Sequence, residues 1–127
     1  MRSHTHTHRF SGTISLGKLP EGLKHLNLWG NHLNGTICLT SLPPALESLR
    51  LGSNYFEGSL DFTRLPDCIE VIYLSKNHFS GTIDLGKLPQ NLQVVEASHN
   101  ALSGTVRVPP GVRCMLHGNA NLTVESM

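Results

Sequence analysis

The chain has 127 residues, of which 39% are hydrophobic and 15% are charged, the balance of a folded globular domain rather than of a disordered segment. Lys and Arg number 10 against 9 Asp and Glu, a formal net charge of +1, which gives no electrostatic reason to expect nucleic acid or an anionic membrane as a partner. No apolar run approaches the roughly 20 residues that span a bilayer, so we expect no membrane insertion of this chain.

Residues 1–9 are polar and rich in histidine. Arg2 is followed by His4, His6 and His8 without an apolar stretch, so the segment does not resemble a signal peptide. In an extended chain the three imidazoles would share one face about 6.6 Å apart, but no nearby carboxylate or cysteine completes a metal site. We predict a His-rich tail or a degenerate first repeat over residues 1–9, and no metal site.

Residues 10–122 repeat with a period of 23 residues. Several positions keep one residue type from unit to unit, among them a glycine, an asparagine and a leucine-proline pair. The glycines are Gly12, Gly35, Gly58, Gly81 and Gly104, the asparagines are Asn31, Asn54, Asn77 and Asn100, and the pairs begin at Leu19, Leu42, Leu65 and Leu88. Such recurrence is typical of a solenoid, in which each unit buries its apolar side chains against its neighbours.

Within a unit, the apolar residues alternate twice. The first alternation, as at Leu26 and Leu28, predicts a short strand whose leucines face the core. The asparagine three residues later predicts a tight inward turn, where its amide can satisfy buried backbone groups. After the glycine, a second alternation such as Ile37 and Leu39 predicts another extended segment on the return side, ended by proline. Stacking such units at about 4.8 Å builds a parallel sheet over a continuous core.

The pattern L-x-x-L-x-L-x-x-N, formed for example by Leu23, Leu26, Leu28 and Asn31, resembles the leucine-rich-repeat signature. Residues 33–37 are similar to the plant-type subclass, although the proline that follows the isoleucine there is missing. Residues 79–85 are similar to repeats of kinetoplastid leucine-rich-repeat proteins. The resemblance implies an α/β-type solenoid, mostly β and coil: a horseshoe segment with a short parallel β-sheet on its concave face.

The repeats are irregular at both ends. Cys114, Leu116 and Asn119 fit the strand pattern only after four residues are dropped, and the pattern stops after Leu122. We therefore predict a leucine-rich-repeat domain of about four to five repeats over residues 10–122, followed by a C-terminal tail over residues 123–127.

The strand residues that alternate with the leucines would line the concave face, the surface that solenoids usually offer to partners. Trp29, Arg50 and Tyr73 fall on neighbouring units there, and these residue types are the most enriched in binding hot spots. The expected partner-binding residues are His25, Asn27, Trp29, Arg50, Val71, Tyr73, Val94 and Glu96. The alternative is ordinary surface, with Arg50 stacked on an aromatic ring and no partner.

These features predict a non-catalytic module that binds a protein or peptide. Asp61 and Asp84 share a column on the return side, but on an open surface they are expected to be solvated, and no catalytic motif accompanies them. We therefore expect no catalytic residues and no cofactor. The alternative function is a structural spacer within a larger surface or scaffold protein, joined to further leucine-rich-repeat units and without a site of its own.

The three cysteines, Cys38, Cys68 and Cys114, occupy unrelated repeat positions, which favours reduced thiols over disulfides or a zinc site. We therefore expect a cytoplasmic location for the chain as it stands. Two sequons, at Asn34 and Asn121, would become glycosylation sites if the N-terminus is truncated and the protein is secreted or displayed at the cell surface.

Overall fold

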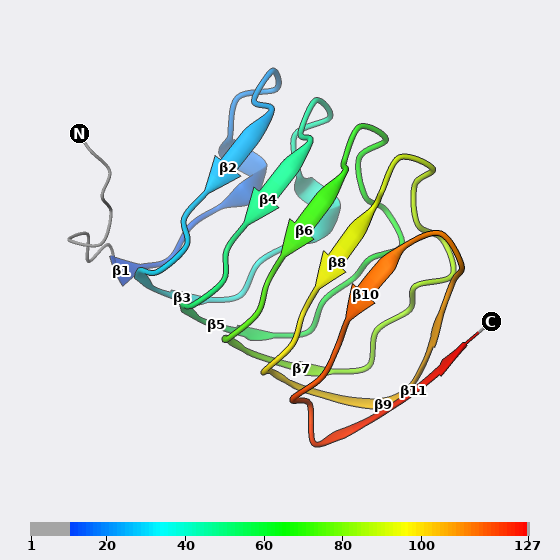
Figure 1. Ribbon diagram of the computed structural model, residues 1–127. Helices are drawn as coiled ribbons and strands as arrows, with labels where there is room; N and C mark the ends of the chain where they lie inside the picture. Colours follow the sequence, from blue (N-terminus) through cyan, green and yellow to red (C-terminus); the bar gives the residue numbers. More distant parts are fainter. Residues whose placement is uncertain (1–10, 127) are drawn as a thin grey trace.

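The computed structural model describes residues 11–126, which wind into a solenoid of about five coils built on two parallel sheets (Figure 1). The predictions for residues 1–9, including His4, His6 and His8, lie outside this part. The five-stranded sheet consists, in spatial order, of β2 (His25–Asn27), β4 (Ser48–Arg50), β6 (Val71–Tyr73), β8 (Val94–Glu96) and β10 (Arg113–Met115). The six-stranded sheet consists of β1 (Ser11–Gly12), β3 (His32–Gly35), β5 (Tyr55–Gly58), β7 (His78–Gly81), β9 (Ala101–Val108) and β11 (Asn121–Ser126).

The five-stranded sheet confirms the first predicted strand of each unit. Leu49, Ile72 and Val95 stand at the centres of their strands and are fully buried, because the period-two alternation turns them toward the core. Strand β10 pairs with β8 in the same register, Arg113 opposite Val94. The shortened last unit therefore keeps its place in the sheet, and the assignment of Cys114 to a strand position is confirmed.

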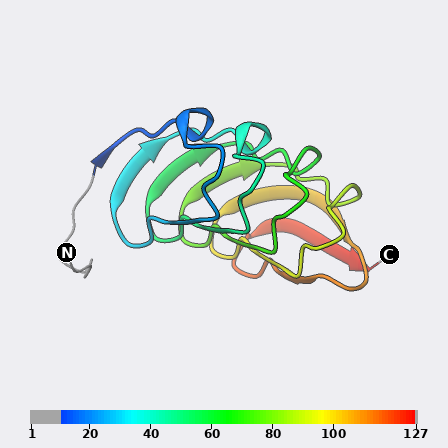
Figure 2. The ribbon, with the colours of Figure 1, turned by 90° about the horizontal axis from the view of Figure 1, so that it is seen from above.

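The second strand of each unit lies earlier in the chain than the sequence predicted. In β3, β5 and β7 it begins directly after the asparagine and ends at the glycine, whereas the expected segment began after the glycine. Figure 2 shows these strands side by side along the solenoid. At that glycine φ is positive, 88° at Gly35 and 90° at Gly58, a left-handed conformation that favours glycine. In these three coils the ladder to the following coil ends at the glycine. Strand β9 alone runs on past its glycine, because β11 pairs with it as far as Val108.

The residues after the glycine form the return side of the coil without a regular strand in most units. Short 3₁₀ helices, η2 (Leu16–Lys18) and η3 (Leu39–Ser41), occur there in the first two coils. The described residues contain no α-helix, so the solenoid is built of β-strands and coil. The proline at the end of the return segment was expected to end a strand, but in the structure it starts a turn. Its carbonyl accepts a hydrogen bond from the amide three residues later, as the Pro43 carbonyl does from the Leu46 amide (3.1 Å).

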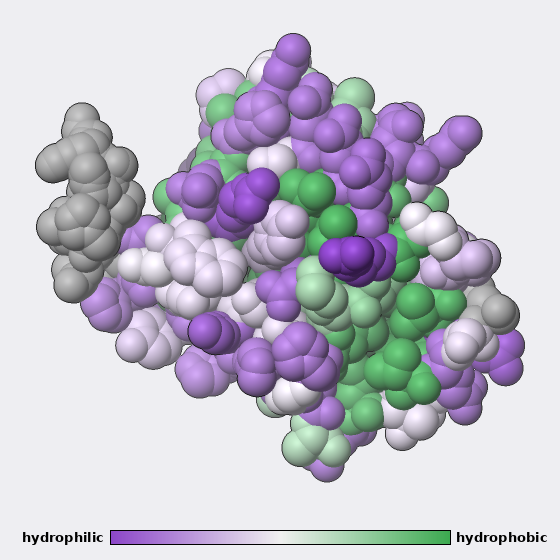
Figure 3. Space-filling view, viewed as in Figure 1, coloured by the Kyte–Doolittle hydropathy of each residue, from purple (hydrophilic) through white to green (hydrophobic). Residues whose placement is uncertain are grey.

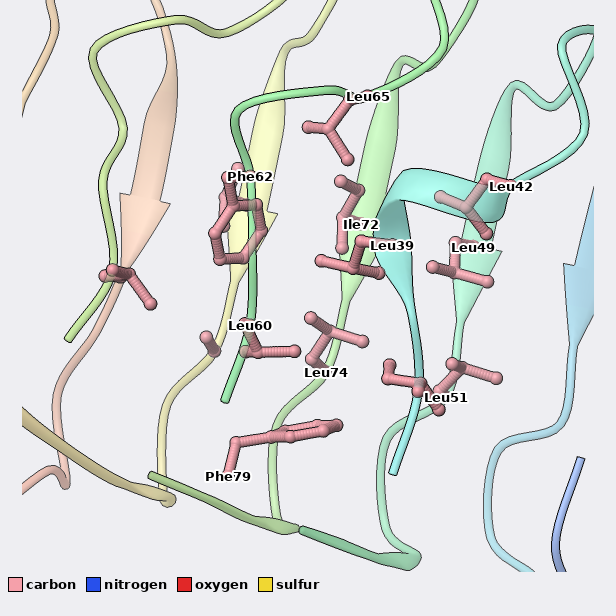
Figure 4. Packing of buried hydrophobic residues seen from close by; sticks show 14 of the residues in the cluster. Leu39, Leu42, Leu49, Leu51, Leu60, Phe62, Leu65, Ile72, Leu74 and Phe79 are labelled. Carbon is pink, nitrogen blue, oxygen red and sulfur yellow. The ribbon is translucent and has the colours of Figure 1, made fainter. Parts of the chain in front are cut away.

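The core fills the space between the sheets and the return segments. Figure 4 shows Leu39, Leu42 and Leu65 of the return segments beside Leu49 and Ile72 of the five-stranded sheet. Phe56 and Phe79, which point inward from β5 and β7, are fully buried and stack with ring centroids 6.2 Å apart. Each coil therefore packs on its neighbours along the whole axis, as expected for a solenoid.

A sharp corner separates the two strands of each coil. The residue before each corner asparagine has a positive φ in all five coils, at Gly30, Ser53, Lys76, His99 and Gly118. The asparagine then satisfies the backbone of the corner. The Asn77 side-chain NH₂ donates to the carbonyls of Leu51 (3.1 Å) and Leu74 (3.2 Å), and its Oδ1 accepts from the Phe56 amide (3.0 Å). The predicted role of the asparagine is confirmed, and the structure adds that its amide links two coils.

The end of the chain differs from the predicted tail over residues 123–127. Residues 123–126 continue β11, paired with β9 from Asn121 opposite Ser103 to Ser126 opposite Val108. The repeat signature ends at Leu122, but a parallel ladder is formed by backbone groups and does not require that signature.

Candidate functional site

The exposed surface of the five-stranded sheet, hereafter the strand face, is the surface that the sequence expected to be concave. Its columns follow the predicted order. Arg50 lies opposite Tyr73 in the register of β4 and β6, and Tyr73 lies opposite Glu96 in that of β6 and β8. The pairing of β2 with β4 places Asn27 opposite Arg50. All eight candidate residues thus lie on or directly beside this sheet.

Trp29 follows β2 and is 44% exposed. Its indole lies across the next coil: a Cβ placed on Gly52 would come within 2.1 Å of Trp29 Cζ3. The backbone of residues 27–29 forms a short turn, in which Asn27 Oδ1 accepts a hydrogen bond from the Trp29 amide (3.1 Å). The absence of a side chain at residue 52 therefore lets the ring lie flat, as a platform that is open to solvent.

Arg50 is exposed, and its guanidinium carbon lies 4.6 Å from the centroid of the Tyr73 ring. This is a cation–π contact, the arrangement that the sequence had offered as the alternative to a binding role. Among the described residues, no carboxylate lies within ion-pair distance of Arg50. The guanidinium is thus held in place by an aromatic ring and has no acidic partner among residues 11–126.

Apolar and charged candidate residues surround Arg50 and Tyr73. Val71 and Val94 are half-buried neighbours, while Glu96 is half-buried and accepts a hydrogen bond from the Ser98 hydroxyl. His25 Nε2 lies 4.0 Å from Glu47 Oε1. The space-filling view from this side shows hydrophilic side chains over much of the molecule and a hydrophobic area between β10 and β11 (Figure 3).

An aromatic row on the six-stranded sheet was missed from the sequence. His32, Tyr55 and His78 begin β3, β5 and β7, and their rings stack with centroids 5.6 and 6.0 Å apart. The sequence analysis had assigned no site to these positions. Their recurrence directly after the corner asparagine was the signal that could have identified them.

The cysteines differ in environment, although all three are free thiols. Hydrogen bonds with Ser41 and Thr40 lower the pKa of exposed Cys38 below its ordinary value. Burial raises the pKa of the half-buried Cys114 thiol. Cys68 is exposed.

The acidic column on the return side is engaged in local turns. Asp61 accepts hydrogen bonds from the Thr63 hydroxyl (2.5 Å) and amide (2.9 Å), which lower its pKa. Asp84 accepts from the Gly86 amide (2.8 Å). Both are exposed and line a shallow hollow of about 470 Å³. Within residues 11–126, no group of three or more His, Cys, Asp or Glu side chains is arranged to hold a metal ion.

Both sequons lie on the six-stranded sheet, away from the strand face. Asn34 is exposed in β3 and Asn121 is exposed at the start of β11. Over the described part of the chain, no helix is long and apolar enough to cross a membrane.

Comparisons with known proteins agree with this architecture. The family model Leucine Rich Repeat matches residues 22–44, the first complete strand and corner. No curated protein matches the chain. The solved LRR ectodomain of the receptor kinase SOBIR1 from Arabidopsis thaliana is similar over 89% of this chain and 67% of its own, with a TM-score of 0.73 and 29% identity. A pollen receptor kinase 3 is similar over 80% of this chain and 64% of its own, with a TM-score of 0.54 and 22% identity, which compares the fold alone. Recurrent sequence, family model and solenoid agree: the chain has the repeats and the fold of leucine-rich-repeat proteins.

Proposed function

We propose that this chain is a non-catalytic recognition module that binds a protein or an extended peptide on its strand face. The observation that carries the proposal is the grouping of Trp29, Arg50 and Tyr73 on three adjacent coils. The indole of Trp29 is open to solvent, and the Arg50 guanidinium is stacked on the Tyr73 ring with no acidic partner in the described part of the chain. Aromatic and arginine side chains of this kind supply most of the energy in protein interfaces.

The preformed character of the surface supports the same role. The Trp29 ring rests on Gly52 and the Arg50 guanidinium rests on Tyr73, so little side-chain freedom remains to be lost on binding. Rigid surfaces bind more tightly than those that must be ordered on contact. His25, Asn27, Val71, Val94 and Glu96 would form the rim of the contact.

The structurally similar proteins give information about the cellular location of this protein. A receptor kinase ectodomain is the 29% identical match, which supports the alternative of a cell-surface or secreted protein over the cytoplasmic expectation. Because this chain spans about two thirds of each of the two matched structures, a role within a longer receptor is part of the proposal. Further coils would then extend the strand face.

The test is affinity capture from an extract of the source organism, comparing the wild type with Trp29→Ala and Tyr55→Ala. Tyr55 is a matched control, because it is an aromatic residue of similar exposure (50%) on the other sheet. We expect a partner that is retained by the wild type and by Tyr55→Ala but reduced at least ~10-fold with Trp29→Ala, since a hot-spot truncation costs about 2 kcal/mol or more. Equal capture by all three proteins, with unchanged thermal melts, would remove the strand face as the site.

A further inference from the structure

Two opposite charges on the strand face have no partner of the other sign within residues 11–126. The Arg50 guanidinium lies against the Tyr73 ring, and no carboxylate of the described chain is within ion-pair distance of it. The Glu96 carboxylate accepts a hydrogen bond from the Ser98 hydroxyl, and no described basic group is within ion-pair distance of it. The strand face therefore offers a ligand one positive and one negative group, and charge complementarity of this kind determines which ligands are accepted.

Arg50 and Glu96 stand in one column of the five-stranded sheet, with Tyr73 between them. The register places Arg50 opposite Tyr73 and Tyr73 opposite Glu96, and Figure 1 shows β4, β6 and β8 as neighbouring strands. Residues that lie opposite each other in neighbouring strands project from the same side of the sheet. The column therefore presents a positive charge, an aromatic ring and a negative charge in the order of the coils.

The surroundings of Arg50 favour an acidic group. Its neighbour Asn27 is exposed, and the side-chain oxygen of Asn27 already accepts a hydrogen bond from the Trp29 amide (3.1 Å). The NH₂ group of Asn27 is thus the donor that this side chain can offer a ligand. Glu47, three residues before Arg50, instead lies near His25, with 4.0 Å between Oε1 and Nε2. Arginine binds a carboxylate through two parallel hydrogen bonds, so a ligand acid fits this position.

An apolar platform lies directly beside Arg50. The Trp29 ring covers Gly52, which follows Arg50 by two residues and therefore faces the same side of the sheet. Val71 and Val94 add half-buried apolar surface in the next two coils. A flat, partly exposed ring of this kind is the surface on which the proline rings of extended peptides pack.

The spacing of the two charges matches that of an extended segment. A polyproline II helix has three residues per turn and rises about 3.1 Å per residue, so residues three apart share one side and lie about 9.3 Å apart. Strands β4 and β8 are two strand spacings apart, which is about 9.6 Å. A segment that follows the solenoid axis in this conformation therefore brings two side chains, three positions apart, over Arg50 and Glu96.

We infer that the ligand of the strand face is an extended, proline-containing protein segment that carries an acidic and a basic residue three positions apart. This inference rests on the proposed recognition function and specifies the chemistry of its ligand. The acidic side chain binds Arg50 beside Asn27, the basic side chain binds Glu96, and a proline ring packs on Trp29. A uniformly acidic ligand is disfavoured, because Glu96 would repel it.

The test is selection of displayed random peptides on the immobilised 127-residue chain, repeated with charge-reversed variants. With the wild type we expect enriched peptides to carry an acid and a base about three positions apart. Arg50→Glu should shift the enriched sequences to two basic residues, and Glu96→Lys should shift them to two acidic residues, because like charges across an interface exclude the former ligands. Arg64→Glu is the matched control, since Arg64 is exposed on the return side, and it should enrich the same peptides as the wild type.

A synthetic peptide of the enriched sequence gives a second readout. It should change the fluorescence emission of Trp29, the only tryptophan, and bind Arg50→Glu at least ~10-fold more weakly than the wild type. Enriched peptides without the acid–base pair, or peptides that bind both charge-reversed variants as well as the wild type, would overturn this inference and leave the recognition role standing. Peptides that bind Trp29→Ala unchanged, or no enrichment at all, would contradict the recognition role as well.

Discussion

At the scale of single residues, Trp29 depends on a residue that has no side chain. Its six-membered ring occupies the space above Gly52, where a Cβ would lie 2.1 to 2.7 Å from three ring atoms. A tryptophan at residue 29 is therefore compatible with glycine at residue 52 of the next coil. It is not compatible with serine, which stands at the corresponding position of later coils, at Ser75 and Ser98. The pair Trp29 and Gly52 forms one structural feature of the strand face.

This arrangement predicts the effect of Gly52→Ala. The added methyl should displace the indole into solvent and shift the fluorescence emission of the only tryptophan to longer wavelength. The free energy of unfolding should change by less than about 1 kcal/mol, because the ring is partly exposed and can move. Gly22→Ala is the control, since a Cβ there meets no atom within 4 Å. An unchanged emission spectrum in Gly52→Ala would show that the ring does not rest on Gly52 in solution.

The sequence predicted which residues share the strand face and offered the stacking of Arg50 on an aromatic ring as an alternative, but it did not predict the contact of Trp29 with Gly52. Trp29, Arg50 and Tyr73 were identifiable because they break the repeat in solvent-facing columns, and the register follows from the period alone. The position of the indole over Gly52 depends on side-chain rotamers, which periodicity does not specify. Tyr55 was missed because the residues directly after the corner asparagine do not alternate with the leucines and were assigned to no surface.

At the scale of elements, the corner asparagines join each coil to the one before it. A buried amide that bonds to both its own coil and the preceding one is satisfied only while the two coils remain stacked. Asn54, Asn77 and Asn100 repeat this geometry with distances between 2.9 and 3.2 Å. Coil-to-coil cohesion therefore depends on a hydrogen-bonded row as well as on the leucine core.

Substitution of one member of this row tests its contribution. Asn77→Ala leaves the Phe56 amide and the Leu51 and Leu74 carbonyls without their side-chain partner in a buried corner. We expect a loss of about 3 kcal/mol in the free energy of unfolding, because unsatisfied buried groups cost about 1–3 kcal/mol each and part of the loss is recovered by relaxation. Asn34→Ala, at an exposed strand position, should cost less than about 0.5 kcal/mol. A loss in Asn77→Ala no larger than in the control, by chemical denaturation, would contradict this role.

The two strands of a coil were not equally predictable. The first strand follows from an alternation of leucines, and its existence was confirmed, although only the first leucine of each pair lies inside it: β2 contains Leu26 and ends before Leu28. The second was displaced because alternating apolar residues after the glycine are buried without forming a strand. In that segment the hydrogen bonds go to turns and short 3₁₀ helices, and burial alone does not distinguish these from a ladder.

At the scale of the whole molecule, the surfaces are divided between the two sheets. The strand face carries Trp29, Arg50 and Tyr73, and the six-stranded sheet carries both sequons. The two sequons lie at different places along that sheet. Asn121 opens β11, the edge strand, whereas Asn34 lies in β3, four strands away along the same sheet.

This division predicts that glycans on the two sequons leave partner binding unchanged if the protein enters a secretory pathway. Asn34 and Asn121 are exposed on the six-stranded sheet, whereas Trp29, Arg50 and Tyr73 belong to the strand face. In secreted protein that carries both glycans, Asn34→Gln and Asn121→Gln should therefore each retain the same partner as the doubly glycosylated protein in affinity capture. Trp29→Ala in the same secreted protein should still reduce capture at least ~10-fold, because the contact that it removes lies on the other sheet. A partner that binds only after one glycan is removed would contradict the assignment of the contact to the strand face.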